Sequence, residues 1–587
     1  MTSREDERDL LILGAGMHGL VMAKTFLQIH PNAKILVIDE AKTVGGTWAK
    51  ERLYPGLKTN NVIGSYEYGD FPMIPEKYGL KPGQHIPGEV VYRYFEDYAA
   101  FHNLHQHIRF SSKATSASLQ DDGSWVVGLA DGTSVRARKL VIATGLLKVP
   151  KMPTLPGREN FKGLLFHAKE LAIRAEELSQ KREIVVIGGN KSAWDAIYTA
   201  AQGGTRVRMV MRPSGGGPHY IWPKRFDWGP FKSLSLATFI SVRAWSVVDP
   251  SPFGKTATSG WVRYVLHQTR IGQAICRMFW NGLDRHIKDI HRFQTDPELA
   301  KLEPWTTPFW TGNSASIHNY ETSWFDLVRK GLITIHLGDV ECLTADQVVL
   351  SNSEYLNAEA IVCCTGWQPD SLIPMKPIEA TGQLTAEAER EAFHRDLVKA
   401  VDFIRRKVPY LSTLPTRTTQ APQVPSFQKQ TGKLSQLHRH MTPWQPHLLQ
   451  QRSIAYMGRA TATHGVLVGQ LQALWITAFF DDKLSHLQAS NVNYDDIRYG
   501  VVLNSTYQQL RRPREAGAMA GLYPEYAFDS LTYVDAIMRD LELNAFRKGR
   551  WWREYFEPYR PKDYKNVVQE WLAKERSERR KHVDKDC

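Results

Sequence analysis

The sequence of 587 residues lacks any long apolar run. No stretch approaches the ~18–20 apolar residues that a membrane-spanning helix needs. The nearest candidates are Ala473–Phe480, which is too short, and Leu236–Val248, which contains Arg243. The amino-terminal MTSREDERD is acidic, so we expect neither a signal peptide nor an arginine-rich transit peptide. These features predict a cytoplasmic protein without a transmembrane segment, and they leave peripheral membrane contact open.

Cysteine is also scarce, with five in the chain. Two of the five are adjacent, and no C-x-x-C pair occurs. This pattern argues against a disulfide framework, a zinc cluster and a thioredoxin-type redox centre, and we expect no metal. The five are Cys276, Cys342, Cys363, Cys364 and Cys587.

The charge is basic but spread along the chain. Lys and Arg number 74 against 61 for Asp and Glu, a net charge of +13. The densest run, Lys574–Lys581, is interrupted by Glu575 and Glu578 and is typical of a solvated helix end. Because a nucleic-acid surface needs a clustered basic stripe, we expect no nucleic-acid partner. The 42% hydrophobic content predicts well-packed globular domains.

The amino-terminal part has the pattern of a dinucleotide-binding unit. The apolar run Asp9–Leu13 leads into Gly14-Ala-Gly16-Met-His-Gly19, a helical stretch and a second apolar run that ends in Asp39. In such a unit the first glycine allows a tight turn, the second lets a pyrophosphate approach, and the third lets helix and strand pack closely. The helix N-terminus faces the phosphates, and Asp39 is expected to accept a hydrogen bond from a ribose hydroxyl.

A second, imperfect unit follows an apolar run, with the sequence Gly188-Gly-Asn190-Lys-Ser192-Ala193. Ala193 is an accepted variant of the last glycine, whereas Asn190 replaces the middle one and narrows the approach of a pyrophosphate. The next strand ends in Arg212, where the first unit has an acid. Because an arginine pairs with a 2′-phosphate that an acid would repel, the second unit favours NADPH over NADH.

Both halves repeat one plan, since each later has a strand that ends in Thr-Gly, at Thr144-Gly145 and at Thr365-Gly366. The sequence therefore predicts an α/β protein with two Rossmann-like domains. FAD would stay bound in the first, and NADPH in the second would deliver hydride to it. The second half is longer, and we assign the surplus to residues 215–310, which hold seven of the 17 tryptophans. Such rings suit an apolar substrate cavity, a membrane surface or a packed insertion.

These patterns divide the chain into four segments. Residues 1–170 would form the first part of the FAD-binding domain, and residues 171–370 the NADPH-binding domain with its insertion at 215–310. Residues 371–480 would complete the FAD-binding domain, and residues 481–587 would form a helical C-terminal extension.

Further motifs carry a resemblance to a known family. They are Val44-Gly45-Gly46-Thr47-Trp48, Tyr54–Asn61, Phe71-Pro72 and Phe161-x-Gly163-x-x-x-His167. With the two fingerprints, this set resembles the class B flavoprotein monooxygenases, which include the flavin-containing and the Baeyer–Villiger monooxygenases. The resemblance covers nearly the whole chain, and the tail is similar to fungal members of secondary metabolism. It implies that Gly46, Thr47 and Trp48 contact FAD.

The resemblance also implies an activity. In the family, NADPH reduces FAD, and oxygen then forms a flavin hydroperoxide that must be kept from water until a substrate arrives. We therefore expect an NADPH- and O2-consuming monooxygenase that acts on a small apolar substrate. Thr59-Asn60 matches the flavin-containing branch, in which such an asparagine supports the oxygen adduct, so Asn60 is the expected catalytic residue. The alternative is an asparagine used for turn chemistry beside Asn61.

Two other functions stay open at the level of sequence. The Baeyer–Villiger fingerprint continues from its histidine to Trp-Pro or Trp-Asp, and this chain has Leu171-Ala172 instead. Baeyer–Villiger oxidation of a ketone is therefore an alternative rather than the first choice. Because Asn190 replaces a glycine of the second fingerprint, an alternative from another functional class also stays open. It is a protein that binds flavin and NADPH but does not oxygenate a substrate. His167 is expected to link the two domains rather than to perform acid–base chemistry.

Overall fold

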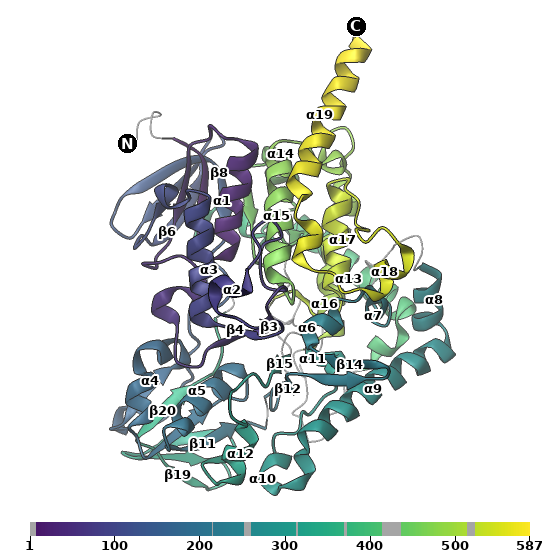
Figure 1. Cartoon of the computed structure of the whole chain (residues 1–587). Helices are drawn as coiled ribbons and strands as arrows, with labels where there is room; N and C mark the ends of the chain where they lie inside the picture. The colour runs from purple at the N-terminus through teal and green to yellow at the C-terminus, as the bar shows by residue number, and fades with distance from the viewer. Residues whose placement is uncertain are drawn as a thin grey trace.

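The computed structural model shows a chain built on two main sheets, a mixed one and a parallel one, each with its own helices (Figure 1). Parts of the predicted segments 171–370, 371–480 and 481–587 lie outside the residues that the structure describes. The described residues are 7–213, 215–251, 260–312, 315–368, 373–413, 436–513 and 523–586.

The first sheet is centred on β1 (Arg8–Leu13), which runs parallel to β2 (Ile35–Ile38) on one side and to β8 (Ser134–Ile142) on the other. Its order is β21-β6-β7-β8-β1-β2-β5, and β24 (Ile454–Tyr456) also pairs with β8. The remaining strands are β5 (Ile108–Arg109), β6 (Ala114–Leu119), β7 (Trp125–Leu129) and β21 (Met375–Lys376). The chain thus returns to this sheet after it has completed the second one.

The second sheet is parallel throughout, in the order β16-β11-β10-β20-β9. Its strands are β9 (Leu164–His167), β10 (Glu183–Ile187), β11 (Arg206–Met211), β16 (Ile333–Leu337) and β20 (Ala360–Cys363). Val185 and Val186 in β10 are both fully buried, as expected for a strand with helices on both faces. The predicted α/β class with two Rossmann-like domains is confirmed. Because β9 belongs to this sheet, the second sheet begins a few residues before position 170.

The insertion folds mainly as helices after β11, at the lower right of Figure 1. Its elements are β12 (Tyr220–Trp222), β13 (Phe226–Trp228), β14 (Phe231–Leu234), α6 (Leu236–Ile240), α7 (Arg243–Ser246), α8 (Gly260–Gln268), α9 (Arg270–His291), α10 (Pro297–Ala300) and the start of α11 (Pro308–Thr311). The strand β15 (Ala315–Ile317), which pairs with β12, follows the insertion. Trp222 and Trp280 are buried in its aromatic core, whereas the side chain of Trp261 is 70% exposed. Most of the insertion is therefore packed, and one part of it faces solvent.

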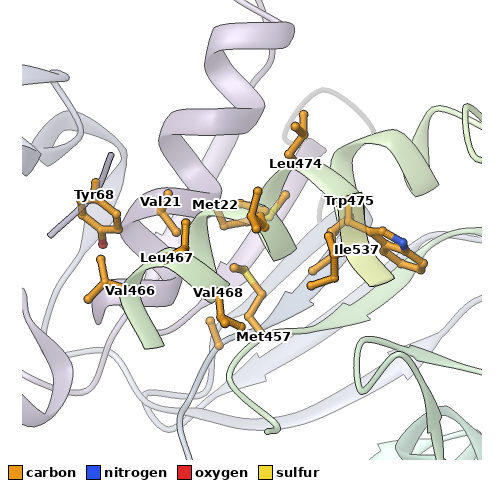
Figure 2. Close-up of a cluster of buried hydrophobic side chains, with 14 of the residues drawn as sticks. Val21, Met22, Tyr68, Met457, Val466, Leu467, Val468, Leu474, Trp475 and Ile537 are labelled. Carbon is orange, nitrogen blue, oxygen red and sulfur yellow. The ribbon is translucent and has the colours of Figure 1, made fainter. Parts of the chain in front are cut away.

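Helix α15 (Gly465–Phe480) lies at the centre of the main core, between α1 (Met17–Ile29) and α17 (Ser530–Asp540) (Figures 1 and 2). Figure 2 shows Leu467 of α15 beside Val21 of α1, and Ile537 of α17 near Trp475. A helix that is apolar all round needs burial on every side, and α15 obtains it from other helices. Among the described residues, no helix combines the length and the apolarity needed to cross a bilayer.

The other described helices and strands complete the two domains and the C-terminal extension. They are β3 (Lys58–Val62), α2 (Pro75–Tyr78), β4 (His85–Pro87), α3 (Gly88–Phe101), α4 (Leu171–Ser179), α5 (Lys191–Gln202), α12 (Trp324–Arg329), β17 (Val340–Leu343), β18 (Gln347–Leu350), β19 (Tyr355–Asn357), α13 (Glu387–Lys407), β22 (Leu437–His438), β23 (Thr442–Pro443), α14 (Pro446–Gln451), β25 (Thr461–Ala462), α16 (Tyr494–Arg511), β26 (Glu525–Tyr526), α18 (Trp551–Phe556) and α19 (Val567–Asp586).

Replacement of Trp475 by alanine should destabilise the protein strongly. The indole is fully buried, stacks on Phe479 with ring centroids 5.6 Å apart, and donates to Asp540 Oδ2 at 3.0 Å. Loss of a buried tryptophan costs about 3–5 kcal/mol. We expect a clear fall in the melting temperature, measured by differential scanning calorimetry. Trp551→Ala is the control, because that side chain is 74% exposed; equal shifts in the two variants would contradict the packing described.

Candidate active site

A cavity of about 350 Å³ opens at the carboxyl ends of β1 and β2. Predicted residues gather on its wall. They are Gly14, Gly16, Asp39, Gly46, Thr47 and Trp48. The carboxyl edge of a parallel sheet is where open α/β folds bind ligands. The cavity wall also includes Tyr66, whose hydroxyl accepts a hydrogen bond from Trp48 Nε1 at 2.9 Å.

The glycines of this cavity are required by close backbone approach. Gly14 has a φ of +113°, and a Cβ there would lie 2.5 Å from the carbonyl oxygen of Ala143. A Cβ on Gly19 would lie 1.7 Å from the carbonyl oxygen of Gly14, so the start of α1 presses directly on the turn. Gly16 faces Gly46 across the cavity mouth, with a Cβ position 3.3 Å from Gly46 Cα. Side chains on Gly14 or Gly19 would collide with the backbone, and a side chain on Gly16 would fill the space that a pyrophosphate needs.

The carboxylate of Asp39 stabilises the turn. Its Oδ2 accepts from the backbone N–H of Ala15 at 2.6 Å, and its Oδ1 accepts from the N–H of Ala41 at 2.8 Å. Each oxygen keeps a further lone pair, so the group can still accept from a ribose hydroxyl. Asp39 therefore connects the end of β2 to the glycine turn as well as lining the cavity.

Sequence reasoning missed four charged residues of the same cavity, namely Glu40, Arg52, Lys113 and Lys148. Glu40 lines the cavity beside Asp39, with Arg52 Nη2 3.8 Å and Lys148 Nζ 3.7 Å from its carboxylate oxygens. The two cations suit the phosphates of a dinucleotide. Only the adjacency of Glu40 to Asp39 gave a signal, because Arg52 and Lys148 come from separate loops.

A second cavity, of about 510 Å³, opens at the carboxyl ends of β10, β11 and β20. Gly188, Asn190 and Arg212 line it, as do Thr365 and Gly366. The two halves of the molecule therefore present equivalent openings. Each opening combines a glycine turn with a later Thr-Gly ending, since Thr144 and Gly145 line the first cavity.

Asn190 has a structural task in the turn where the fingerprint has glycine. It is the N-cap of α5: its Oδ1 accepts from the N–H of Ala193 at 3.2 Å. Its Nδ2 donates to the carbonyl oxygen of Cys364 at 3.2 Å. Both polar atoms of the Asn190 side chain are thus hydrogen-bonded to backbone atoms of the protein. Ser192 and Ala193 lie on the first turn of α5 and are not among the described residues that line the cavity.

Arg212 lies at the end of β11 with an exposed side chain on the wall of the second cavity. It forms no ion pair with any other residue that the structure describes. Among the described residues that line this wall, Asp339, which follows β16, is the one acid. The guanidinium is therefore available to a phosphate of a ligand in this cavity.

The Tyr-Pro-Gly motif joins the two domains. The hydroxyl of Tyr54 donates to Asp195 Oδ2 of α5 at 2.9 Å, and burial together with this carboxylate raises the pKa of Tyr54 well above its usual value. Thr59 lies a few residues after Tyr54, and its carbonyl oxygen accepts a hydrogen bond from Asn319 Nδ2 at 3.0 Å. The strand β3 is thereby held against the segment around β15.

Asn60 lies at this junction. Its side chain is exposed, and Nδ2 donates to Ser316 Oγ of β15 at 3.0 Å. It is not among the described residues that line the first two cavities. Its neighbour Asn61 donates from Nδ2 to the carbonyl oxygen of Thr463 at 3.1 Å, directly after β25, whose residues line the first cavity. The two asparagines therefore face different partners.

His167 lies at the end of β9 and holds the turn that follows β20. Its Nε2 donates to the carbonyl oxygen of Gly366 at 3.0 Å, while its Nδ1 accepts from the N–H of Lys169 at 3.1 Å. These two bonds together select the neutral Nε2–H form, and burial lowers the pKa of the imidazole. The geometry gives His167 a structural role.

A third cavity, of about 390 Å³, lies between the β3–β4 region, α6 and residues 558–560. Ser241 on its wall is hydrogen-bonded through Oγ to His464 Nε2 at 2.6 Å, and His464 Nδ1 to Ser530 Oγ at 2.8 Å. Burial lowers the pKa of His464 to about 4, so the ring is neutral at neutral pH. Sequence reasoning missed this chain because its three members come from distant segments.

Together, the first and second cavities define a protein that binds two dinucleotides. The first cavity has glycines, cations and acids suited to FAD, and the second has a glycine turn and a free arginine suited to NADPH. A family described as pyridine nucleotide-disulphide oxidoreductase matches residues 11–220, which include both fingerprints.

Full-length relatives identify the family more closely. The FAD-dependent monooxygenase rstn6 of Aspergillus nomiae is 31% identical over 589 residues, which cover 96% of this chain and 98% of the relative. An FAD-dependent monooxygenase of Pyrenophora dematioidea is also 31% identical, over 92% of this chain and 98% of its own. This chain belongs to the FAD-dependent monooxygenases, as the resemblance to class B flavoprotein monooxygenases predicted.

Solved structures share the fold. Polycyclic ketone monooxygenase from Thermothelomyces thermophila superposes with a TM-score of 0.57 at 15% identity, over 92% of this chain and 89% of the other. The open form of a cyclohexanone monooxygenase superposes with a TM-score of 0.55 at 16% identity, over 91% of this chain and 98% of the other.

We expect Gly16→Val to abolish FAD retention. The β-branched side chain would occupy the space beside Gly46 that a pyrophosphate needs. Stability should fall as well, because bound flavin stabilises the folded state by mass action. The measurement is the ratio of flavin absorbance to protein in the purified variant.

Gly56→Val is the control, because a Cβ at Gly56 meets no atom within 4 Å, although its φ of +80° adds local strain. A Gly16→Val protein with a full complement of FAD would refute the role assigned to Gly16.

Proposed function

We propose that this FAD-dependent monooxygenase uses NADPH and O2 to oxygenate a small apolar molecule. The observation that carries the proposal is the pair of equivalent cavities, of which the second presents the unpaired Arg212. FAD would occupy the first cavity, formed by residues 1–170 and 371–480. NADPH would occupy the second, which is lined mainly by residues 171–370 and also by Lys151 and Pro153–Leu155. When bound, FAD supplies the redox chemistry by accepting hydride and reacting with oxygen.

The chain itself would bind, orient and shield the reactants. The glycine turns admit the two pyrophosphates, Asp39 and Glu40 offer acceptors for ribose hydroxyls, and Arg212 binds the 2′-phosphate. The contacts of Tyr54 with Asp195 and of Asn319 with the carbonyl oxygen of Thr59 hold the two domains closed against each other. Closure of that kind excludes water from the reacting atoms.

Asn60 is the catalytic residue in this proposal. Its carboxamide is a neutral hydrogen-bond donor at the junction of β3 and β15, on the strand whose next residue contacts Thr463 beside the first cavity. A preorganised donor of this type stabilises negative charge that develops on oxygen. For Asn60 to reach the reacting oxygen, its bond to Ser316 would have to be exchanged for one to the ligand.

The direct test is oxygen consumption by purified, FAD-loaded protein. NADPH should drive O2 uptake, and mass spectrometry with ¹⁸O2 should find one oxygen atom in a product when a panel of apolar amines, sulfides, alkenes and ketones is supplied. A lactone or ester from the ketones would establish the Baeyer–Villiger alternative. Flavin that NADPH fails to reduce would establish the non-oxygenating alternative.

Arg212→Ala should weaken the binding of NADPH much more than the binding of NADH. Loss of one charge-assisted contact with a phosphate costs roughly 1.5–3 kcal/mol, which corresponds to about tenfold to 150-fold in affinity. The readout is the apparent KM for each cofactor in flavin reduction. An equal effect on the two cofactors would show that Arg212 does not bind the 2′-phosphate.

Asn60→Leu should uncouple NADPH oxidation from oxygenation of the substrate. NADPH does not need the carboxamide in order to reduce FAD, whereas negative charge that develops on the reacting oxygen would lose its hydrogen-bond donor, worth about a hundredfold in rate. Flavin reduction should persist, and hydrogen peroxide released per NADPH oxidised should rise. Asn60→Asp should do the same, because it removes the donor and adds a negative charge.

Two control variants separate catalysis from structure. Ser316→Ala removes the partner of Asn60 but leaves the carboxamide, and Asn61→Leu removes the neighbouring asparagine and its bond to Thr463. If the contact between β3 and β15 alone matters, Ser316→Ala will reproduce the uncoupling. An unchanged peroxide yield in Asn60→Leu with normal flavin content would remove Asn60 from the mechanism.

A further inference from the structure

The α8–α9 hairpin carries an apolar surface that no other described element covers. It consists of Trp261, Tyr264 and Val265 on α8 and of Ile271, Ile275 and Met278 on α9, which we call the hairpin face. The spacing within each set places its members on one side of their helix. Three of the six side chains are at least 70% exposed, namely Trp261, Ile271 and Met278. Exposed groups of large apolar side chains mark interaction surfaces.

The opposite side of the hairpin is fixed to the body of the protein. Cys276, Trp280 and Leu283 of α9 are buried, the latter two in the core of the insertion. The two helices meet tightly, since a Cβ on Gly272 would lie 1.9 Å from the carbonyl oxygen of Val265. The hairpin face is therefore the outer side of a rigid element.

The charge along Gly260–Leu283, the stretch that carries the hairpin face, has one sign, whereas the rest of α9 contains Asp284 and Asp289. Residues Gly260–Leu283 contain three arginines and no aspartate or glutamate. Arg263 is used internally, because its guanidinium donates to the carbonyl oxygens of Asp249 and Ser246. Arg270 and Arg277 are exposed and form no ion pair with any described residue. These two cations accompany the apolar side chains, and no anion among the described residues pairs with them.

A second group of exposed aromatic side chains lies on α18. Trp551 is 74% exposed, and Trp552 and Phe556 are about half exposed. Helix α18 packs against α7, and Arg263 of α8 donates to Ser246 at the end of α7. Figure 1 shows α8 and α18 at the same side of the molecule. Tryptophan next to arginine is the composition of the boundary between lipid headgroups and acyl chains.

We propose that the hairpin face binds the surface of a membrane that contains anionic phospholipids. The apolar side chains would enter the boundary of headgroups and acyl chains, while Arg270 and Arg277 would pair with lipid phosphates and carboxylates. A second copy of this chain fits less well as the occupant, because a symmetric contact would bring the unpaired arginines of both copies together. The proposal does not depend on the chemistry at the flavin.

The test is flotation of the FAD-loaded, full-length protein with vesicles. The protein should float with phosphatidylcholine–phosphatidylserine vesicles and much less with phosphatidylcholine alone. Ile271→Ser/Ile275→Ser/Met278→Ser should weaken binding at least about tenfold. Arg270→Gln/Arg277→Gln should weaken binding to the anionic vesicles by about tenfold and reduce its dependence on salt. NADPH-driven oxygen uptake in solution should be unchanged in both variants.

Ile173→Ser is the matched control, because Ile173 on α4 is 77% exposed, as Ile271 is, and lies outside the hairpin. It should leave flotation unchanged. Failure of the wild-type protein to bind anionic vesicles would overturn the proposal, as would equal losses in the Ile173 and hairpin variants. A change of oligomeric state in the triple variant, seen by analytical ultracentrifugation without vesicle binding, would identify the face as a protein interface and overturn the proposal too.

Discussion

The close approach of α1 to the end of β1 is the constraint on which the first cavity depends. Because a Cβ on Gly19 would lie 1.7 Å from the carbonyl oxygen of Gly14, the helix can begin at this distance only with glycine. That contact sets the N-terminus of α1 against the turn, and Asp39 fixes the turn from the next strand through the N–H of Ala15. The position of any phosphate in the cavity follows from these few backbone contacts.

The same half of the molecule also positions the elements that arrive late in the sequence. Helix α15 packs on α1, so the segment before it, β25, reaches the wall of the first cavity (Figure 2). Asn61 and His464 attach that segment to β3 and to the insertion. The active-site region is therefore assembled from four parts of the chain, although the dinucleotide cradles are local.

The local features were predictable from sequence, whereas the contacts between segments were not. Each glycine fingerprint lies within a short stretch, so spacing alone placed Gly14, Gly188 and Arg212 at the ends of strands. The bond from Asn190 Nδ2 to the carbonyl oxygen of Cys364 was hidden, because Cys364 lies far away in the sequence. Arg52, Lys148 and the Ser241–His464–Ser530 chain carry no motif, and only the tertiary fold brings them to a cavity.

The most direct measurement is an anaerobic stopped-flow titration of the purified, FAD-loaded protein, followed at the flavin absorbance band. The account predicts that NADPH bleaches the band rapidly and that NADH does so much more slowly, because only NADPH carries the phosphate that Arg212 can bind. Flavin that stays oxidised with NADPH would contradict the proposed monooxygenase mechanism, and flavin that both cofactors reduce at the same rate would contradict the role of Arg212 in the second cavity.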